Sequence, residues 1–203
     1  MKKIQIFALV ALAALVAVSC SKSKSSDEPV SDAPVCKTLK LHVDWELSKD
    51  ITDNFNVVLA TTDFDGKAES DTLRGIAGSS TFTKEDANID GDKDMWPFLL
   101  GVNVARKDNA DIQKTSYNPQ FKFQCYAEFF DAEGKELNTG SGDGTNKSSI
   151  IFKDYSKESS ISSFEAFESF IERLNEKEQT YSFYRGKSAL SGEYFFSWSK
   201  PKQ

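Results

Sequence analysis

Large apolar side chains alternate with polar ones over several short stretches of this 203-residue chain. The clearest case is 39–47, where leucine, valine and tryptophan occupy every odd position and charged residues or histidine every even one. Successive side chains of a β-strand point to opposite faces of the sheet, so this period of two predicts a strand with one buried face. The same pattern recurs at 55–59 and at 121–129. A chain with such stretches must pair them into sheets and cover their apolar faces.

Further strands are predicted at 72–76, 80–83, 98–106 and 149–155, with a closing hairpin at 181–187 and 192–199. Turn residues separate the alternating stretches. The run Asp63-Phe64-Asp65-Gly66 predicts a turn, and Gly134 suits a hairpin position that needs positive φ. Residues 138–147 hold three glycines and no large apolar side chain, and they are predicted to form a loop.

One late stretch has helical spacing instead. Ser162 is a good N-cap, and Glu165 three residues later completes a capping-box pattern. The stretch predicts an amphipathic helix over about 162–178 that packs on a sheet. Its apolar stripe consists of Phe164, Phe167, Phe170, Ile171 and Leu174.

Many short alternating stretches with turns between them predict a mainly β fold. The expected architecture is an antiparallel β-sandwich or barrel-like domain with one amphipathic helix in the C-terminal region, followed by a hairpin. Strands on both sides of a single helix argue against repeated βαβ units. A barrel with one late helix and a strand after it also resembles the lipocalins in outline. Trp45 lacks their early Gly-x-Trp signature, however, so a lipocalin architecture is only the alternative.

The first twenty residues differ from the rest of the chain. Lys2 and Lys3 precede an unbroken apolar run at 6–18, and small or medium side chains lead up to Cys20. A charged start, an apolar run and a small-residue site together predict a secretory signal peptide. The apolar run is shorter than the ~20 residues that span a bilayer, so a permanent transmembrane helix is the weaker interpretation.

Val18-Ser19-Cys20 resembles the lipobox of bacterial lipoproteins, with Ala17 where that family prefers leucine. The resemblance covers only the leader and this cysteine. It implies that residues 1–19 are removed and that Cys20 carries lipid on its sulfur and on its new amino group. Several acyl chains, palmitate among them, would anchor the protein stably. Ser21 stands where inner-membrane lipoproteins carry a retention aspartate, so the resemblance favours the outer membrane of the cell envelope. An ordinary secretory signal is the alternative.

Residues 20–35 are predicted to comprise the lipidated cysteine and a flexible tether. Val30 is the only large apolar side chain between 21 and 34, which is too little to offset the entropy of ordering. Residues 36–203 are expected to form a single β-rich domain with its own core. Removing the leader leaves 23 basic and 31 acidic residues, a net charge of −8, which argues against nucleic acid as a partner.

Two cysteines remain in the predicted domain, Cys36 and Cys125. An exported protein meets oxidising conditions, so a disulfide between them is permitted. Cys125 also lies in the apolar phase of its alternating stretch. A buried free thiol that acts as a small apolar side chain is therefore the other interpretation.

The acidic segment at 86–94 carries an oxygen-bearing side chain at every second position. Gly91 is its sixth residue, counted from Asp86. Its first six positions match the EF-hand loop pattern, and such oxygens are the ligands that Ca²⁺ prefers. Pro97 replaces the usual bidentate glutamate, so the resemblance is to an isolated calcium loop, with Glu85 or a distant acid completing the shell. A solvated acidic turn is the alternative. The candidate calcium ligands are Asp86, Asn88, Asp90, Asp92 and Asp94.

The single histidine, His42, lies on the polar phase of its strand and is predicted to be a surface residue. The sequence contains no histidine-based triad, multi-histidine zinc site, nucleophile elbow, P-loop or dinucleotide fingerprint. It therefore predicts a non-enzymatic envelope lipoprotein that binds a protein, a glycan or a small ligand, or joins an assembly. A carboxylate-dependent hydrolase of envelope or dietary glycans is the alternative. Trp45, Trp96 and Trp198 either line a binding groove or pack in the core.

Overall fold

The computed structural model describes residues 33–62, 66–90, 96–137, 149–175 and 179–199. Within them, an α-helical turn and one longer helix accompany two antiparallel sheets, so the predicted antiparallel β-sandwich with a late helix and a closing hairpin is confirmed. The strands are β1 (Cys36–Leu47), β2 (Phe55–Thr62), β3 (Ala68–Thr72), β4 (Ala77–Ile89), β5 (Trp96–Arg106), β6 (Phe121–Phe130), β7 (Ile150–Tyr155), β8 (Gln179–Lys187) and β9 (Tyr194–Ser199). The helices are α1 (Lys49–Asn54), α2 (Phe164–Ile171) and the 3-10 helix η1 (Glu172–Asn175).

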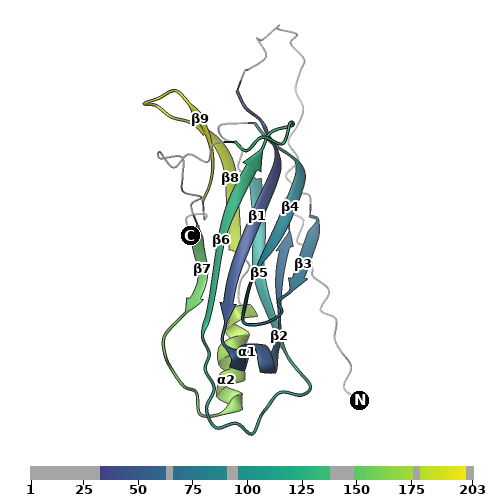
Figure 1. Cartoon of the computed structure of the whole chain (residues 1–203), viewed down its shortest axis with the longest axis vertical. Helices are drawn as coiled ribbons and strands as arrows, with labels where there is room; N and C mark the ends of the chain where they lie inside the picture. Colours follow the sequence, from purple (N-terminus) through teal and green to yellow (C-terminus); the bar gives the residue numbers. More distant parts are fainter. Residues whose placement is uncertain (1–32, 63–65, 91–95, 138–148, 176–178, 200–203) are drawn as a thin grey trace, which may run out of the picture. The chain divides into compact units, whose positions relative to one another are not determined.

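The two sheets are separate layers. One has the strand order β4–β1–β6–β7 and the other β3–β2–β5–β8–β9. Figure 1 looks onto the first sheet, with β5 of the second sheet passing behind β1. Each sheet ends in edge strands among the described residues, so the lipocalin alternative, which needs one closed wall, is not the architecture found.

The core lies between the sheets and is formed by the inward phase of the alternating strands. Leu41 and Val43 of β1 have no exposed surface, and Phe129 of β6 is 1% exposed. Phe129 contacts Phe183 of β8 edge to face, with 5.9 Å between ring centroids, and so joins the two layers. Burying each such side chain fully contributes about 1.5–3 kcal/mol. The apolar side chains whose alternation predicted the strands therefore also hold the two sheets together.

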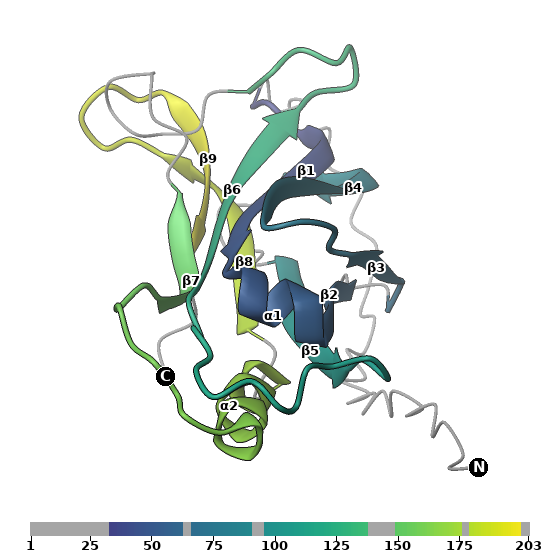
Figure 2. The ribbon, with the colours of Figure 1, turned by 60° about the horizontal axis from the view of Figure 1, so that its bottom comes forward.

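Both α-helices lie at the same end of the sheets (Figure 1, Figure 2). The ring of Phe167 in α2 is fully buried there. It stacks on Tyr117 with 4.9 Å between centroids and meets Phe55 edge to face at 5.5 Å. These aromatic contacts close the end of the core, as the apolar stripe of the predicted helix requires.

The observed helix is shorter than the predicted one over 162–178. It begins after Ser163, whose Oγ accepts a hydrogen bond from the N–H of Ala166, one residue later than the predicted cap. After η1, Asn175 Oδ1 accepts from the N–H of Val104 at 2.6 Å, and its Nδ2 donates to the Val104 carbonyl at 3.3 Å. The Asn175 side chain thus bonds to the backbone of β5 at Val104, beyond the part of β5 that pairs with β8. Residues 176–178 lie outside the described part of the chain.

Two of the weaker strand predictions have shifted bounds. Residues 73–76, predicted as strand, form the turn between β3 and β4, where Gly75 has a φ of +83°. The strand predicted at 80–83 extends over all of β4. Gly134 has the expected positive φ, +77°. The loop predicted at 138–147 lies outside the described residues.

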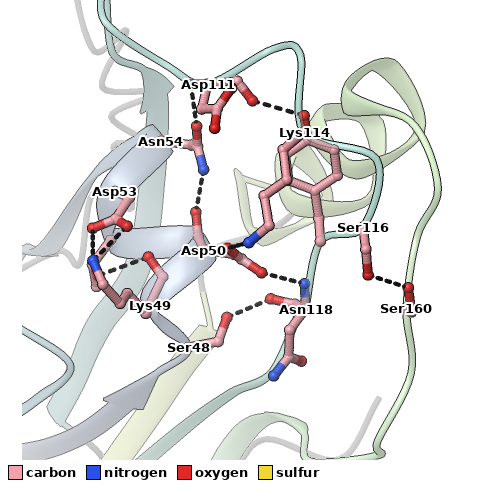
Figure 3. A network of polar contacts seen from close by, with 12 residues as sticks. Ser48, Lys49, Asp50, Asp53, Asn54, Asp111, Lys114, Ser116, Asn118 and Ser160 are labelled. Carbon is pink, nitrogen blue, oxygen red and sulfur yellow. Dashed lines mark hydrogen bonds and ion pairs between the residues drawn. The ribbon is translucent and has the colours of Figure 1, made fainter.

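The sequence did not predict α1 or the ordered connection that leads from β5 to β6. A network of polar contacts holds that connection against α1 (Figure 3). Asn54 at the end of α1 is 2% exposed. Its Nδ2 donates to the Asp50 carbonyl and its Oδ1 accepts from the N–H of Asp111, both at 2.7 Å. One buried side chain thereby satisfies the backbone of two segments.

Asp50 holds the same connection at a second place. Its Oδ2 accepts from the N–H of Asn118 at 2.7 Å, and Lys114 forms an ion pair with its Oδ1. Ser48 Oγ donates to the Asn118 carbonyl at 2.5 Å. Because this connection makes no strand of its own, its fixed path depends on these side-chain contacts.

We expect Asn54→Ala to lower the free energy of unfolding by about 1–3 kcal/mol, because it removes a buried side chain that bonds to the Asp111 N–H and to the Asp50 carbonyl. Urea denaturation would measure the change. Asn56→Ala is the matched control, since Asn56 is exposed on the adjacent strand and should change stability little. Equal effects of the two substitutions would contradict the role assigned to Asn54.

Candidate functional site

Three hollows in the described surface border Ala77, where the start of β4 pairs with the end of β1. The edge hollow, of about 410 Å³, lies between β3 and β4, and the face hollow, of about 270 Å³, opens on the outer side of the four-stranded sheet. The end hollow, of about 330 Å³, borders the end of β1 and the start of β6. Trp45 and Gly78 line both the edge hollow and the face hollow.

The pairing of Trp45 with Gly78 shapes this region. The two residues are direct partners in the β1–β4 register. A Cβ atom at position 78 would lie 2.5 Å from Cζ2 of the Trp45 indole, so only glycine allows the ring to lie across β4 there. Trp45 is 5% exposed, and its indole N–H is buried without a hydrogen-bond partner among the described residues.

The edge hollow combines groups that donate and groups that accept hydrogen bonds. Asp71 lines it from β3 and Arg74 from the turn that follows, while Ser79 and Ser80 line it from β4. Ser80 is 5% exposed, and its Oγ donates to Asp71 Oδ2 at 2.6 Å. This bond connects the edge strands of the two sheets and holds the Asp71 carboxylate in place.

The face hollow belongs to the outer side of the four-stranded sheet, which no described helix or strand covers in Figure 1. Neighbouring strands align their polar residues in rows there. Asp44 pairs with Gln124, and Glu46 pairs with Lys122. These four side chains line the hollow. The surface therefore presents carboxylate, amide and ammonium groups on a rigid sheet.

His42 lies further along the same face, between Thr81 on β4 and Tyr126 on β6. Its ring stacks on Tyr126 with 4.5 Å between centroids. Its Nδ1 is 2.9 Å from Thr81 Oγ1, and its Nε2 is 2.8 Å from Glu128 Oε2. A neutral ring satisfies both contacts when Nε2 donates to Glu128 and Nδ1 accepts from the Thr81 hydroxyl.

This chain of hydroxyl, imidazole and carboxylate has the order of a hydrolase triad, and the sequence did not reveal it because its members lie far apart. His42 occupies the polar face of its strand, as predicted, and its side chain is 15% exposed. The three groups stand across adjacent strands on a sheet face and border none of the three hollows. The arrangement is that of cross-strand pairs that stabilise a sheet.

The candidate calcium ligands Asp86 and Asn88 lie in β4, whose end departs from regular pairing. Thr38 pairs with Glu85, but Cys36 two residues earlier pairs with Ile89, so β4 has additional residues at this point. Both candidate ligands have positive φ, +56° and +52°. Aspartate and asparagine tolerate this conformation better than most residues, which accounts for their presence in a bulge.

The calcium site itself stays a prediction. Asn88 Oδ1 accepts from the Lys37 ammonium at 2.5 Å, and Asn88 Nδ2 donates to the Asp86 carbonyl at 2.7 Å. Asp90 is exposed, while Asp92 and Asp94 lie outside the described residues. Within the described ranges, no group of three or more acidic, histidine or cysteine side chains is placed to hold a metal ion.

Both cysteines of the domain are free and buried, so the disulfide alternative is not what the structure has. Cys125 pairs with Val43, seven residues along β1 from Cys36. At about 3.3 Å per strand residue the two lie roughly 20 Å apart, whereas a disulfide needs Cα atoms within about 7 Å. The other interpretation, a buried thiol in the apolar phase, describes Cys125.

The remaining candidates have mixed outcomes. Trp45 and Trp198 are buried in the core, as the packing interpretation predicted. Trp96 belongs to β5, but its side chain lies outside what is described. Cys20 also falls outside the described residues.

Burial raises the pKa of the Cys36 thiol to about 11 and that of the Cys125 thiol to about 12. We therefore expect neither to react with Ellman's reagent in the native protein at pH 8, and both to react in denaturant. Since these pKa values are higher than in the unfolded chain, stability should fall as the pH rises from about 9 towards 12. Rapid labelling of either thiol in the native state, mapped by peptide mass, would contradict this burial.

Gly78→Ala should lower the free energy of unfolding by about 1–3 kcal/mol, because the added methyl group meets the Trp45 ring. Thermal and urea unfolding would measure the loss. Ser79→Ala at the adjacent exposed position serves as the control and should leave stability nearly unchanged. A Gly78→Ala protein as stable as the parent would show that the indole does not need this space.

Within the described residues, no helix combines the length and the apolar character needed to cross a membrane. No protein-family model, no curated protein and no solved structure matches the chain.

Proposed function

We propose that this protein is a cell-envelope lipoprotein, anchored through lipidated Cys20, whose β-rich domain binds a ligand or joins an assembly without catalysing a reaction. The leader, the lipobox resemblance and the polar tether support the anchor. The outer membrane is the favoured location, because Ser21 follows the cysteine. The membrane is then one partner, reached through lipid, and a protein or a glycan is the other.

The observation that carries the binding role is the pair of hollows on either side of Trp45. Each has charged groups of both signs in its lining, on paired strands in the face hollow and on β3 and the turn after it in the edge hollow. Rigid strands place polar groups more accurately than free loops do, which lowers the entropy cost of binding. A site of this kind recognises a polar ligand by several hydrogen bonds.

The hydrolase alternative receives less support from the same surface. Asp44 and Glu46 are neighbours on one face of β1, with Cα atoms roughly 7 Å apart. Glycoside hydrolysis needs two carboxyl groups on opposite sides of the scissile bond. Two acids on one strand of an open sheet face approach a ligand from the same side, which suits binding better than hydrolysis.

The anchor can be tested on protein from the membrane fraction of a bacterium that expresses the full chain. We expect its mass to show cleavage before Cys20 and acyl groups on that residue. Cys20→Ala should abolish both the acyl mass and the membrane association. Cys36→Ala is the matched control and should retain both, because Cys36 is a buried thiol of the domain.

An uncleaved leader, or a mature chain without acyl mass, would overturn the lipoprotein assignment. Membrane association that survives Cys20→Ala would show instead that another part of the chain binds the membrane.

A further inference from the structure

Trp45, one of the residues that line the edge hollow, has a buried indole N–H without a hydrogen-bond partner among the described residues. Buried donors almost always have a hydrogen-bond partner, and an unpaired one requires an explanation such as a ligand or an ordered water. Trp45 is 5% exposed, its nitrogen is buried, and no described residue accepts from it. Trp45 is also among the residues that line the edge hollow.

The other polar groups of the edge hollow would suit a neutral partner that both donates and accepts hydrogen bonds. Asp71 offers carboxylate oxygens, and its orientation is set by the buried Ser80 hydroxyl at 2.6 Å. Arg74 offers guanidinium donors from the same stretch of chain. One carboxylate and one guanidinium balance in charge, so neither an anion nor a cation is favoured.

We propose that the edge hollow binds a saccharide, with a sugar oxygen accepting from the Trp45 N–H and sugar hydroxyls donating to Asp71. A hydroxyl group donates and accepts at the same atom, which matches the mixed lining. The volume of about 410 Å³ lies within the range of small-molecule sites and suits one or two sugar units. This inference rests on the proposed binding function and names the ligand class and the site.

Binding requires a small local movement. The indole nitrogen has almost no accessible surface in the free structure, so the ring must tilt or the Ala77–Gly78 segment must shift before a sugar oxygen reaches it. Gly78 lies directly against the indole, because a Cβ atom there would meet the ring, so either movement changes the surroundings of the Gly78 backbone amide. The Gly78 amide is therefore a second reporter beside the indole N–H.

The experiment is a nuclear magnetic resonance titration of the ¹⁵N-labelled protein recovered from the envelope, kept in micelles of a detergent without a sugar headgroup. Trp45→Phe assigns the Trp45 indole signal. The probes are glucose, galactose, mannose, N-acetylglucosamine, maltose and cellobiose at millimolar concentration. The acyl mass on Cys20 is measured on the same sample, so a failed anchor and a failed site give different results.

We expect at least one saccharide to move the Trp45 indole and Gly78 amide signals saturably. Asp71→Asn should weaken that binding by about tenfold, the effect of losing one good hydrogen bond to a charged group. Asp108→Asn, an exposed carboxylate in the connection after β5, is the control and should bind as the parent does. A dispersed spectrum would show that each variant is folded.

Three results would overturn the proposal. The first is no response of the Trp45 indole to any saccharide, which would leave a buried water as its partner. The second is binding that Asp71→Asn does not weaken, which would place the saccharide elsewhere. The third is a response to an extended peptide, added as a further probe, and to none of the saccharides, which would make β4, an edge strand among the described residues, a strand-pairing site instead.

Discussion

The fold depends on burying one face of β1 while that strand is hydrogen-bonded on both sides. β4 pairs with it along one edge and β6 along the other, so a slip of one residue in register would turn its apolar residues towards solvent. The inward side chains of these strands meet those of the second sheet, and Phe129 and Phe183 contact each other across the layers. The two α-helices close one end of this arrangement.

The same pairing explains why hollows form beside Trp45. The largest side chain of β1 stands opposite a residue with no side chain, and the small residue Ala77 precedes it. The indole therefore fills the space over Gly78 and leaves its N–H without a partner, while the surface on both sides of β4 stays open. The packing of Trp45 against Gly78 thus accompanies a hollow with polar lining residues at the sheet edge.

The elements with strong periodicity were predictable from the sequence, and those held by distant contacts were not. Alternation located β1, β5 and β6, and the phenylalanine stripe located α2. In contrast, α1 has only six residues, too few for a periodic pattern, and its connection to residues 107–120 depends on Asn54. β3 is mostly exposed and so shows no alternation. The edge hollow requires Trp45 and Gly78 to meet across 33 residues of chain, which no local pattern encodes.

The bond between Arg185 and the start of the described chain has a mechanical consequence. Arg185 Nη1 donates to the Pro34 carbonyl at 2.8 Å, just before the chain enters β1. If the protein hangs from a lipid at Cys20, any tension on the tether enters the fold at this point and runs along β1. Because β1 lies inside its sheet, the load falls on the hydrogen bonds to both neighbours at once, whereas an edge strand would be held on one side only. A first strand inside its sheet therefore resists being pulled out of the domain better than an edge strand would.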